Sequence, residues 1–283
     1  MDRDAVVTLL QRLPQGAISR GWGWLARRRS PKMAVSALKR AFVAAAGIDM
    51  REAAEDIEQY KTLEDLFVRE LRHGARRIDP DPAAVVSPVD GVLGACGRVT
   101  EGTMLQVKGR SYSVSKLLNS DADAGRFEGG DYATFYLSPK DYHRVHAPIS
   151  GNIHQATVVP GRLLPVFAEA VAQVEDLFAR NERVITYIDH ETMGRVAVVK
   201  VGATMVGRIT VTYDASIASN VFGQSIRELA YHPPHRILKG ACVGAFELGS
   251  TVVMLTESGR IHLKGLKPGM AVHMGERIGQ SKS

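Results

Sequence analysis

Three short clusters in the 283-residue sequence carry side chains that could do chemistry. They are Asp90 before a glycine, the pair His143 and His146, and Ser250 after Gly249 at the start of an apolar run. A serine hydroxyl becomes a nucleophile when a neighbouring base removes its proton, and histidine is the usual base near neutral pH. A carboxylate can orient such a histidine and stabilise its protonated form. These residue types suit nucleophilic chemistry if the fold brings them together.

Taken singly, each cluster also has a plain structural interpretation. An aspartate before glycine is common in turns, and so is a Gly-Ser-Thr tripeptide. Two histidines three residues apart do not share a face of a strand, and no third ligand is evident, so a zinc hydrolase is disfavoured. The Ser250 cluster also lacks the second glycine of the Gly-x-Ser-x-Gly turn of α/β-hydrolases.

The elements that must position these clusters fall into two sections. Several N-terminal segments have the apolar spacing of amphipathic helices, and a capping sequence at Thr62 indicates another, so the first 73 or so residues are predicted to be helical. The N-terminal segments are residues 3–13, 17–29 and 30–47. After the Asp-Pro repeat at 79–82, short strand-like runs dominate, and one helix-like stretch at about 164–179 interrupts them. The runs are 85–89, 132–137, 184–188, 196–201, 206–213 and 251–256.

We therefore predict an α+β fold, in which a helical N-terminal section precedes a mainly antiparallel β body. A weakly repeated sequence pattern supports hairpin elements in that body. Ser87-Pro-Val-Asp-Gly91 and Ala147-Pro-Ile-Ser-Gly151 share a small-Pro-x-x-Gly pattern ahead of an apolar strand. Such patterns occur in lipoyl-like hairpin folds and equally in ordinary β-turns.

Composition and charge exclude several classes of protein. Hydrophobic residues make up 45% of the chain, which excludes wholesale disorder. No apolar run reaches the roughly 18–20 residues that span a bilayer, and no secretory signal is evident. Two cysteines, Cys96 and Cys242, indicate a reducing compartment. Residues 1–46 carry nine basic and two acidic side chains, a net charge of +7, whereas the remainder carries 27 basic and 28 acidic ones.

Read together, the clusters resemble one protein family. Phe246-Glu-Leu-Gly-Ser-Thr-Val-Val-Met-Leu255 is similar to the Leu-Gly-Ser-Thr self-cleavage motif of the pyruvoyl-dependent, prokaryotic-type phosphatidylserine decarboxylase proenzymes. Further blocks in family order extend the resemblance over roughly residues 45–280. They are Phe67–Arg72, Ser87–Val92, Val107–Gly109 with Tyr112-Ser113, Leu137–His146, Leu177–Arg183 and Val201–Thr204. One departure is Cys242, near which many family members carry an acidic residue.

The resemblance implies a protein that makes its own cofactor. Ser250 would attack the Gly249 carbonyl, and elimination followed by hydrolysis would leave a covalent pyruvoyl group at position 250. The products would be a large chain, 1–249, and a small chain, 250–283, which form a heterodimer that can dimerise further. The resemblance assigns Asp90 and His146 to a charge relay for this self-cleavage. It makes His143 a candidate for substrate positioning or proton transfer, and it implies no metal.

The implied reaction converts phosphatidylserine to phosphatidylethanolamine and CO2, with the pyruvoyl group forming a Schiff base with the substrate amine. A membrane lipid as substrate gives the basic N-terminus a role. Residues 1–46 become a basic amphipathic segment that docks the catalytic domain, 47–283, on an anionic membrane as a peripheral protein on its cytoplasmic side. No nucleic-acid-binding module accompanies the charge. Two alternatives stay open: helices that pack on the body with a solvated charged face, and a lipid-binding module without catalysis.

Overall fold

The structure is a computed structural model that describes residues 15–105, 111–204, 208–221, 223–247 and 250–282. The N-terminal helices α2 (Gln15–Ala26) and α3 (Lys32–Ala46) follow the predicted segments closely. Pro31 occupies the N-cap of α3, one residue later than the sequence indicated, and Gly47 ends the helix in the left-handed conformation. The predicted helix at 3–13 lies outside the described residues.

The segment from 47 to 73 is less helical than predicted. It contains the 3-10 turn η1 (Met50–Glu52) and the short helix α4 (Leu63–Phe67), which begins where the Thr62 hydroxyl accepts from the Asp65 N–H. Extended pieces on either side of α4 hydrogen-bond to each other, with Ala54 N–H donating to the Glu70 carbonyl and Arg72 N–H to the Glu52 carbonyl. Their backbone groups are thus satisfied across the chain and not along a helix.

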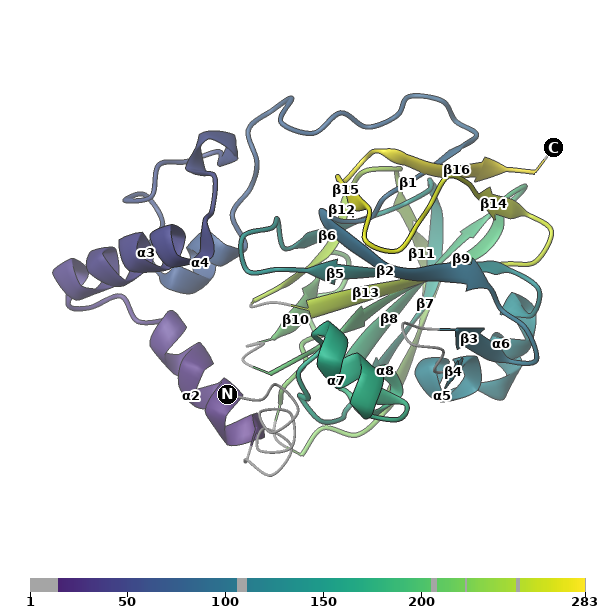
Figure 1. Cartoon of the computed structure of the whole chain (residues 1–283), viewed down its shortest axis with the longest axis horizontal. Helices are drawn as coiled ribbons and strands as arrows, with labels where there is room; N and C mark the ends of the chain where they lie inside the picture. Colours follow the sequence, from purple (N-terminus) through teal and green to yellow (C-terminus); the bar gives the residue numbers. More distant parts are fainter. Residues whose placement is uncertain (1–14, 106–110, 205–207, 222, 248–249, 283) are drawn as a thin grey trace.

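The described strands build a mainly antiparallel body, which confirms the predicted α+β fold (Figure 1). The largest sheet has eight strands, in the order β11 (Arg227–Ile237), β7 (Gly151–Val159), β8 (Arg183–His190), β9 (Gly194–Val201), β13 (Ser250–Thr256), β5 (Asp131–Leu137), β2 (Gly91–Arg98) and β15 (Ala271–Val272). Two three-stranded sheets are β10 (Ile209–Val211), β12 (Cys242–Phe246) and β6 (Arg144–His146), and β1 (Ala84–Val86), β16 (Arg277–Ser281) and β14 (Ile261–Leu263). A fourth pairing joins β3 (Thr103–Leu105) to β4 (Ser111–Ser113).

The two faces of the large sheet pack into two different cores, because successive side chains of a strand point to opposite faces. Along β13, Val253 and Leu255 join a core closed by helices, whereas Val252 and Met254 join a core shared with the three-stranded sheets. The helices of the first core are α5 (Val114–Leu118), α6 (Asp121–Phe127), α7 (Ala168–Gln173) and α8 (Leu177–Arg180). The expectation of a single helix-like stretch among the strands was wrong, since α5 and α6 precede it. The hydroxyls of Ser113 and Ser120 cap these two short helices.

The two segments that share the small-Pro-x-x-Gly pattern also have similar structures. Gly91 and Gly151 each begin a strand that presses against its neighbour, so a Cβ on either would lie 2.5 Å from a backbone carbonyl oxygen, that of Tyr136 or Asp189. The two segments also touch, because Val86 N–H donates to the Pro148 carbonyl and His146 N–H to the Pro88 carbonyl. Only glycine allows such close approach of two strands.

Candidate active site

The segments that carry the predicted site residues leave the same end of the large sheet. Ser250 opens β13 and pairs with Leu137 at the end of β5. From Leu137 the chain runs through residues 138–143 into β6, and β6 pairs with β12, which leads back toward position 250. Both histidines therefore lie beside the strand that precedes the predicted cleavage site, with Phe246 N–H donating to the His143 carbonyl at 3.0 Å.

His146 is a buried, neutral imidazole with a defined tautomer. Its Nδ1 lies 2.8 Å from the Gly240 carbonyl oxygen, and its Nε2 lies 3.2 Å from the Tyr142 hydroxyl. A carbonyl can only accept, so Nδ1 carries the proton and Nε2 presents the lone pair, to which Tyr142 donates. Burial lowers the pKa of His146, and burial raises the pKa of the Tyr142 phenol, so both stay uncharged at neutral pH. The atom able to take a proton is Nε2.

Asp90 lies near His146 but bonds to other groups. Arg76 donates to both carboxylate oxygens, with a closest approach of 2.5 Å from Nη2, and the Met274 N–H donates to Oδ1 at 2.8 Å. Within the described residues the two ring nitrogens of His146 bond to Gly240 and Tyr142, so Asp90 acts on the imidazole through space, where its charge opposes the lowering of the His146 pKa. The Gly240 carbonyl holds the imidazole orientation.

Asp90 and position 250 share one end of the large sheet. In the strand register, Val92 pairs with Tyr136, and Tyr136 pairs with Thr251. Asp90 and Ser250 both lie beyond this row on the same side. Their strands are separated by β5 alone, which puts the two backbones about 10 Å apart at a strand spacing of about 4.8 Å. Gly249 lies outside the described residues, and for Ser250 the structure describes the backbone only.

His143 occupies a fully buried position beside the N-terminal helices. Its ring packs against Phe67 of α4, with centroids 4.0 Å apart, and its Nδ1 bonds to the Asp141 carbonyl at 2.8 Å. Burial lowers the pKa of His143 to about 3, so the imidazole is neutral and its Nε2 is an acceptor. That Nε2 has no hydrogen-bond partner among the described residues. The geometry favours a role as a hydrogen-bond acceptor over one as a proton donor.

Three residues of the site were not singled out in the sequence. Tyr142 and Arg76 contact His146 and Asp90 directly, and Tyr142 stands inside the Leu137–His146 block, where its position between two candidate residues could have drawn attention. The third, Glu247, lies two residues before Gly249, and Arg27 of α2 approaches its carboxylate to 3.6 Å. No local pattern relates Arg27 to Glu247, because they are 220 residues apart in the sequence.

A polar cavity of about 340 Å³ opens beside Asp90. Its walls hold the basic Arg69, Arg76, Lys140 and His273 and the acidic Asp49, Glu52, Asp90 and Asp141. Arg76 is already paired with Glu52 and Asp90. Arg69 is 4% exposed, and its Nε and Nη1 have no hydrogen-bond partner among the described residues. The buried Arg69 guanidinium can therefore donate to an acceptor group of a ligand in this cavity of mixed charge.

The described residues contain no group of three His, Cys, Asp or Glu side chains arranged to hold a metal ion. None of the described helices is both long enough and apolar enough to cross a bilayer.

Comparison with known proteins identifies the family. The sequence model of the family described as phosphatidylserine decarboxylase matches residues 63–280. A phosphatidylserine decarboxylase proenzyme from Anaeromyxobacter sp. (strain K) is 44% identical over 275 residues, covering 96% of this chain and 97% of the relative. Proenzymes of the same name from Brevibacillus brevis and Myxococcus xanthus are 38% and 40% identical, covering 100% and 99% of both chains. The chain therefore belongs to the phosphatidylserine decarboxylase family.

Proposed function

We propose that this protein is a self-processing, pyruvoyl-dependent enzyme that decarboxylates phosphatidylserine to phosphatidylethanolamine at a membrane surface. The observation that carries the proposal is the buried neutral His146 on β6, because β6 pairs with β12, the strand that precedes the Gly249–Ser250 link, and its Nε2 presents a lone pair. A base of this kind is what a serine needs in order to act as a nucleophile. Membership of a decarboxylase family supplies the reaction class.

In the proposed processing step, His146 Nε2 takes the proton of the Ser250 hydroxyl, whose oxygen attacks the Gly249 carbonyl carbon. The Gly249–Ser250 C–N bond breaks, the freed amine takes a proton, and an ester links the two residues. Loss of the residue 250 Cα proton then expels the Gly249 carboxylate and leaves dehydroalanine. Hydrolysis releases ammonia and leaves the pyruvoyl group. Before the first step, His146 Nε2 must exchange the Tyr142 hydroxyl for that of Ser250.

Asp90 and Gly240 have separate roles in this proposal. The Gly240 carbonyl holds the Nδ1–H tautomer, which keeps the lone pair on Nε2. Asp90 stabilises the imidazolium that forms when Nε2 takes the proton, acting through space. Its bond from Met274 also ties the large-chain side of the site to residues of the proposed small chain.

A buried polar atom without a partner is available to a polar substrate. The His143 Nε2 is buried and lacks a partner among the described residues. When present, a pyruvoyl carbonyl supplies an electrophile for a primary amine and a sink for the electron pair left by CO2. His143 accepts a hydrogen bond and positions the substrate, and Arg69 and Lys140 attract its acidic groups at the cavity mouth.

Membrane docking follows from the N-terminal segment. On α2, Trp24 is 58% exposed with the Arg28 guanidinium 3.5 Å over its ring, and at the start of α3 Met33 is 87% exposed. Exposed apolar side chains among cations suit the interface of an anionic membrane, and we assign the protein to its cytoplasmic face. The same helices also pack on the body, since Ala26 joins Leu63, Leu66 and Phe67 in one core. Deletion of residues 1–46 would thus disturb the site, and point substitutions test docking better.

The test of self-processing is the intact mass of the denatured, purified protein. We expect two chains, 1–249 and 250–283, with the second lacking a free amine and carrying the mass of a pyruvoyl group at position 250. Ser250→Ala should leave one 30.8 kDa chain and no decarboxylase activity. His146→Ala should strongly slow cleavage. Tyr142→Phe is the matched control, because it removes a hydroxyl from the same pair and leaves the base. Active wild-type enzyme recovered as a single chain would refute self-processing.

A further inference from the structure

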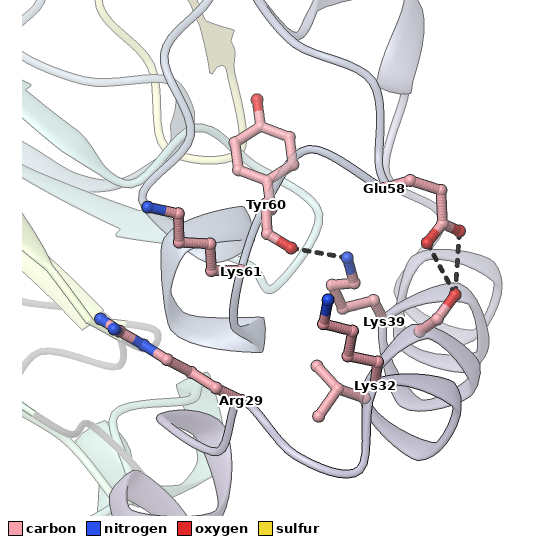
Figure 2. Close-up of a pocket in the computed structure, with 8 residues that line it drawn as sticks. Arg29, Lys32, Lys39, Glu58, Tyr60 and Lys61 are labelled. Atoms are coloured by element: carbon pink, nitrogen blue, oxygen red, sulfur yellow. Dashed lines mark hydrogen bonds between the residues drawn. The ribbon is translucent and has the colours of Figure 1, made fainter.

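A second cavity, of about 450 Å³, opens between α3 and the turn at residues 57–61 (Figure 2). Four cationic side chains and one carboxylate, that of Glu58, line it. The cations are Arg29, Lys32, Lys39 and Lys61. None of them belongs to the proposed catalytic machinery.

Part of this charge is used within the protein. Lys39 is 3% exposed, and its Nζ donates to the carbonyls of Ile57 and Tyr60 at 2.7 and 2.6 Å, which ties α3 to the turn. The Glu58 carboxylate accepts from the Ser36 hydroxyl at 2.8 Å and from Arg40 Nε at 2.8 Å, so it is already paired on α3.

Three cations are left over at the cavity. For Arg29, Lys32 and Lys61 the described residues provide no hydrogen bond or ion pair, and all three residues are exposed. Figure 2 draws their side chains among the residues that line the cavity. The beginning of the 15-residue helix α3 adds to the positive potential, because Pro31 at its N-cap makes no side-chain bond and its first turn holds no acidic residue. The cavity is thus a concave site with uncompensated positive charge.

The surroundings indicate where an anionic ligand would come from. Met33 follows Lys32 in the first turn of α3 and is 87% exposed. A free anion in water would gain nothing from this apolar side chain, whereas a lipid would place its headgroup among the cations and an acyl chain against Met33. A phosphate diester has the charge and acceptor oxygens that lysine and arginine bind.

We propose that this cavity binds the phosphate group of an anionic phospholipid that is not the molecule undergoing decarboxylation. The inference rests on the proposed membrane docking and adds a headgroup site to it. Lys61 distinguishes this site from general electrostatic attraction by the basic segment 1–46. It lies outside that segment but lines the cavity, so a specific effect of its removal would indicate the site.

The experiment measures binding of the full-length protein to two kinds of vesicle matched in surface charge. One contains phosphatidylglycerol in phosphatidylcholine, and the other contains oleate in phosphatidylcholine. The wild-type protein should prefer phosphatidylglycerol. Lys61→Ala should reduce that preference about fivefold, which corresponds to about 1 kcal/mol, because the lipid phosphate would lose the hydrogen bond from the Lys61 ammonium. Arg28→Ala removes one charge outside the cavity and should weaken binding to both vesicles equally, leaving the preference unchanged.

A third arm separates the lipid from free phosphate. Inorganic phosphate at constant ionic strength should raise the melting temperature of the wild-type protein and not that of Lys61→Ala, and it should compete with phosphatidylglycerol vesicles. Stabilisation by phosphate without any vesicle preference would assign the site to a soluble ligand and overturn the lipid proposal. Equal vesicle preference for wild type and Lys61→Ala would overturn the site itself. Decarboxylation of phosphatidylserine in detergent micelles, measured on the same samples, reports on the catalytic proposal independently.

Discussion

The Glu247→Gln substitution tests the electrostatics of the chain just before the proposed cleavage site. The Glu247 side chain is 14% exposed, and its Oε2 has no hydrogen-bond partner among the described residues. Arg27 lies between two carboxylates, 3.2 Å from Glu64 and 3.6 Å from Glu247. Burial, and then the neighbouring Glu64, raise the pKa of Glu247 to about 8. The carboxyl therefore keeps its proton at neutral pH in the folded protein, and glutamine imitates this neutral form.

The sign and size of the effect follow from proton linkage. The folded-state pKa of about 8 exceeds the reference value of 4.5, so the folded state binds more protons between these values. The stability that this provides is fully present below about pH 4.5 and is lost as the pH rises through 8. Between about pH 6 and 9 a single site of this kind loses up to ~2.6 kcal/mol. Because Glu64 and Glu247 share the proton and the site is partly hydrated, we expect ~1–2 kcal/mol.

The assay is thermal unfolding of the wild-type protein and Glu247→Gln in parallel from pH 6 to 9. Both should be made in the Ser250→Ala background, which keeps the chain in one piece. The wild-type melting temperature should fall relative to the variant by about 2–8 °C across this range, given about 2–4 °C per kcal/mol for a protein of this size. Glu276→Gln, an exposed acid, is the matched control and should follow the wild type. Parallel curves for the wild type and Glu247→Gln would refute the reasoning.

Three further predictions follow from packing and topology. Gly91→Ala should destabilise the fold by about 1–3 kcal/mol in thermal melts, because its Cβ would lie 2.5 Å from the Tyr136 carbonyl oxygen, and it should also reduce the rate of self-cleavage. Gly94→Ala is the control on the same strand: its Cβ would lie 3.6 Å from the nearest atom, so it should change the stability little. Lys200→Met should stabilise the protein by about 1–4 kcal/mol at pH 7, because Lys200 is fully buried, its Nζ makes one hydrogen bond among the described residues, to Thr186, and burial lowers its pKa to about 7. The gain should shrink as the pH rises from 7 toward 10.5, and a constant gain would contradict this cause. The processed chains should co-elute in native gel filtration and separate only in denaturant, since β13 of the small chain lies between β5 and β9 of the large chain; dissociation on dilution would contradict the pairing.

Much of the fold could be predicted from local sequence. The predicted runs at 132–137, 184–188, 196–201 and 251–256 are strands β5, β8, β9 and β13. Alternating or continuous apolar residues between turn signals specify such strands, because their side chains must reach one or both cores. The helices α5 and α6 escaped this reasoning, since each is shorter than two full turns and gives too few residues for helical periodicity to emerge.

The ordered motifs also nominated candidate site residues, but they could not predict the hydrogen bonds that these residues make. The motifs name Asp90, His143, His146 and Ser250 without stating which atoms touch. The structure gives the orienting role at His146 to the Gly240 carbonyl and pairs Asp90 with Arg76. A backbone carbonyl has no signature in a sequence, and a salt bridge between residues 14 apart depends on how intervening turns fold. The assignment of Asp90, His146 and Ser250 to one relay stays a prediction.

The sequence by itself determined the family, the chemistry-bearing residue types and the concentration of positive charge in residues 1–46, because each of these is a property of residue order. Only the tertiary structure decided which of these basic side chains are paired within the protein and which face solvent. Arg27 faces the carboxyl groups of Glu64 and Glu247 before the proposed cleavage site, and Lys39 is buried against the carbonyls of the 57–61 turn. Lys32 and Lys61 lie at a cavity without a partner among the described residues. Charge is additive along a chain, but the groups that compensate it, and the water that screens it, are set by packing between distant segments.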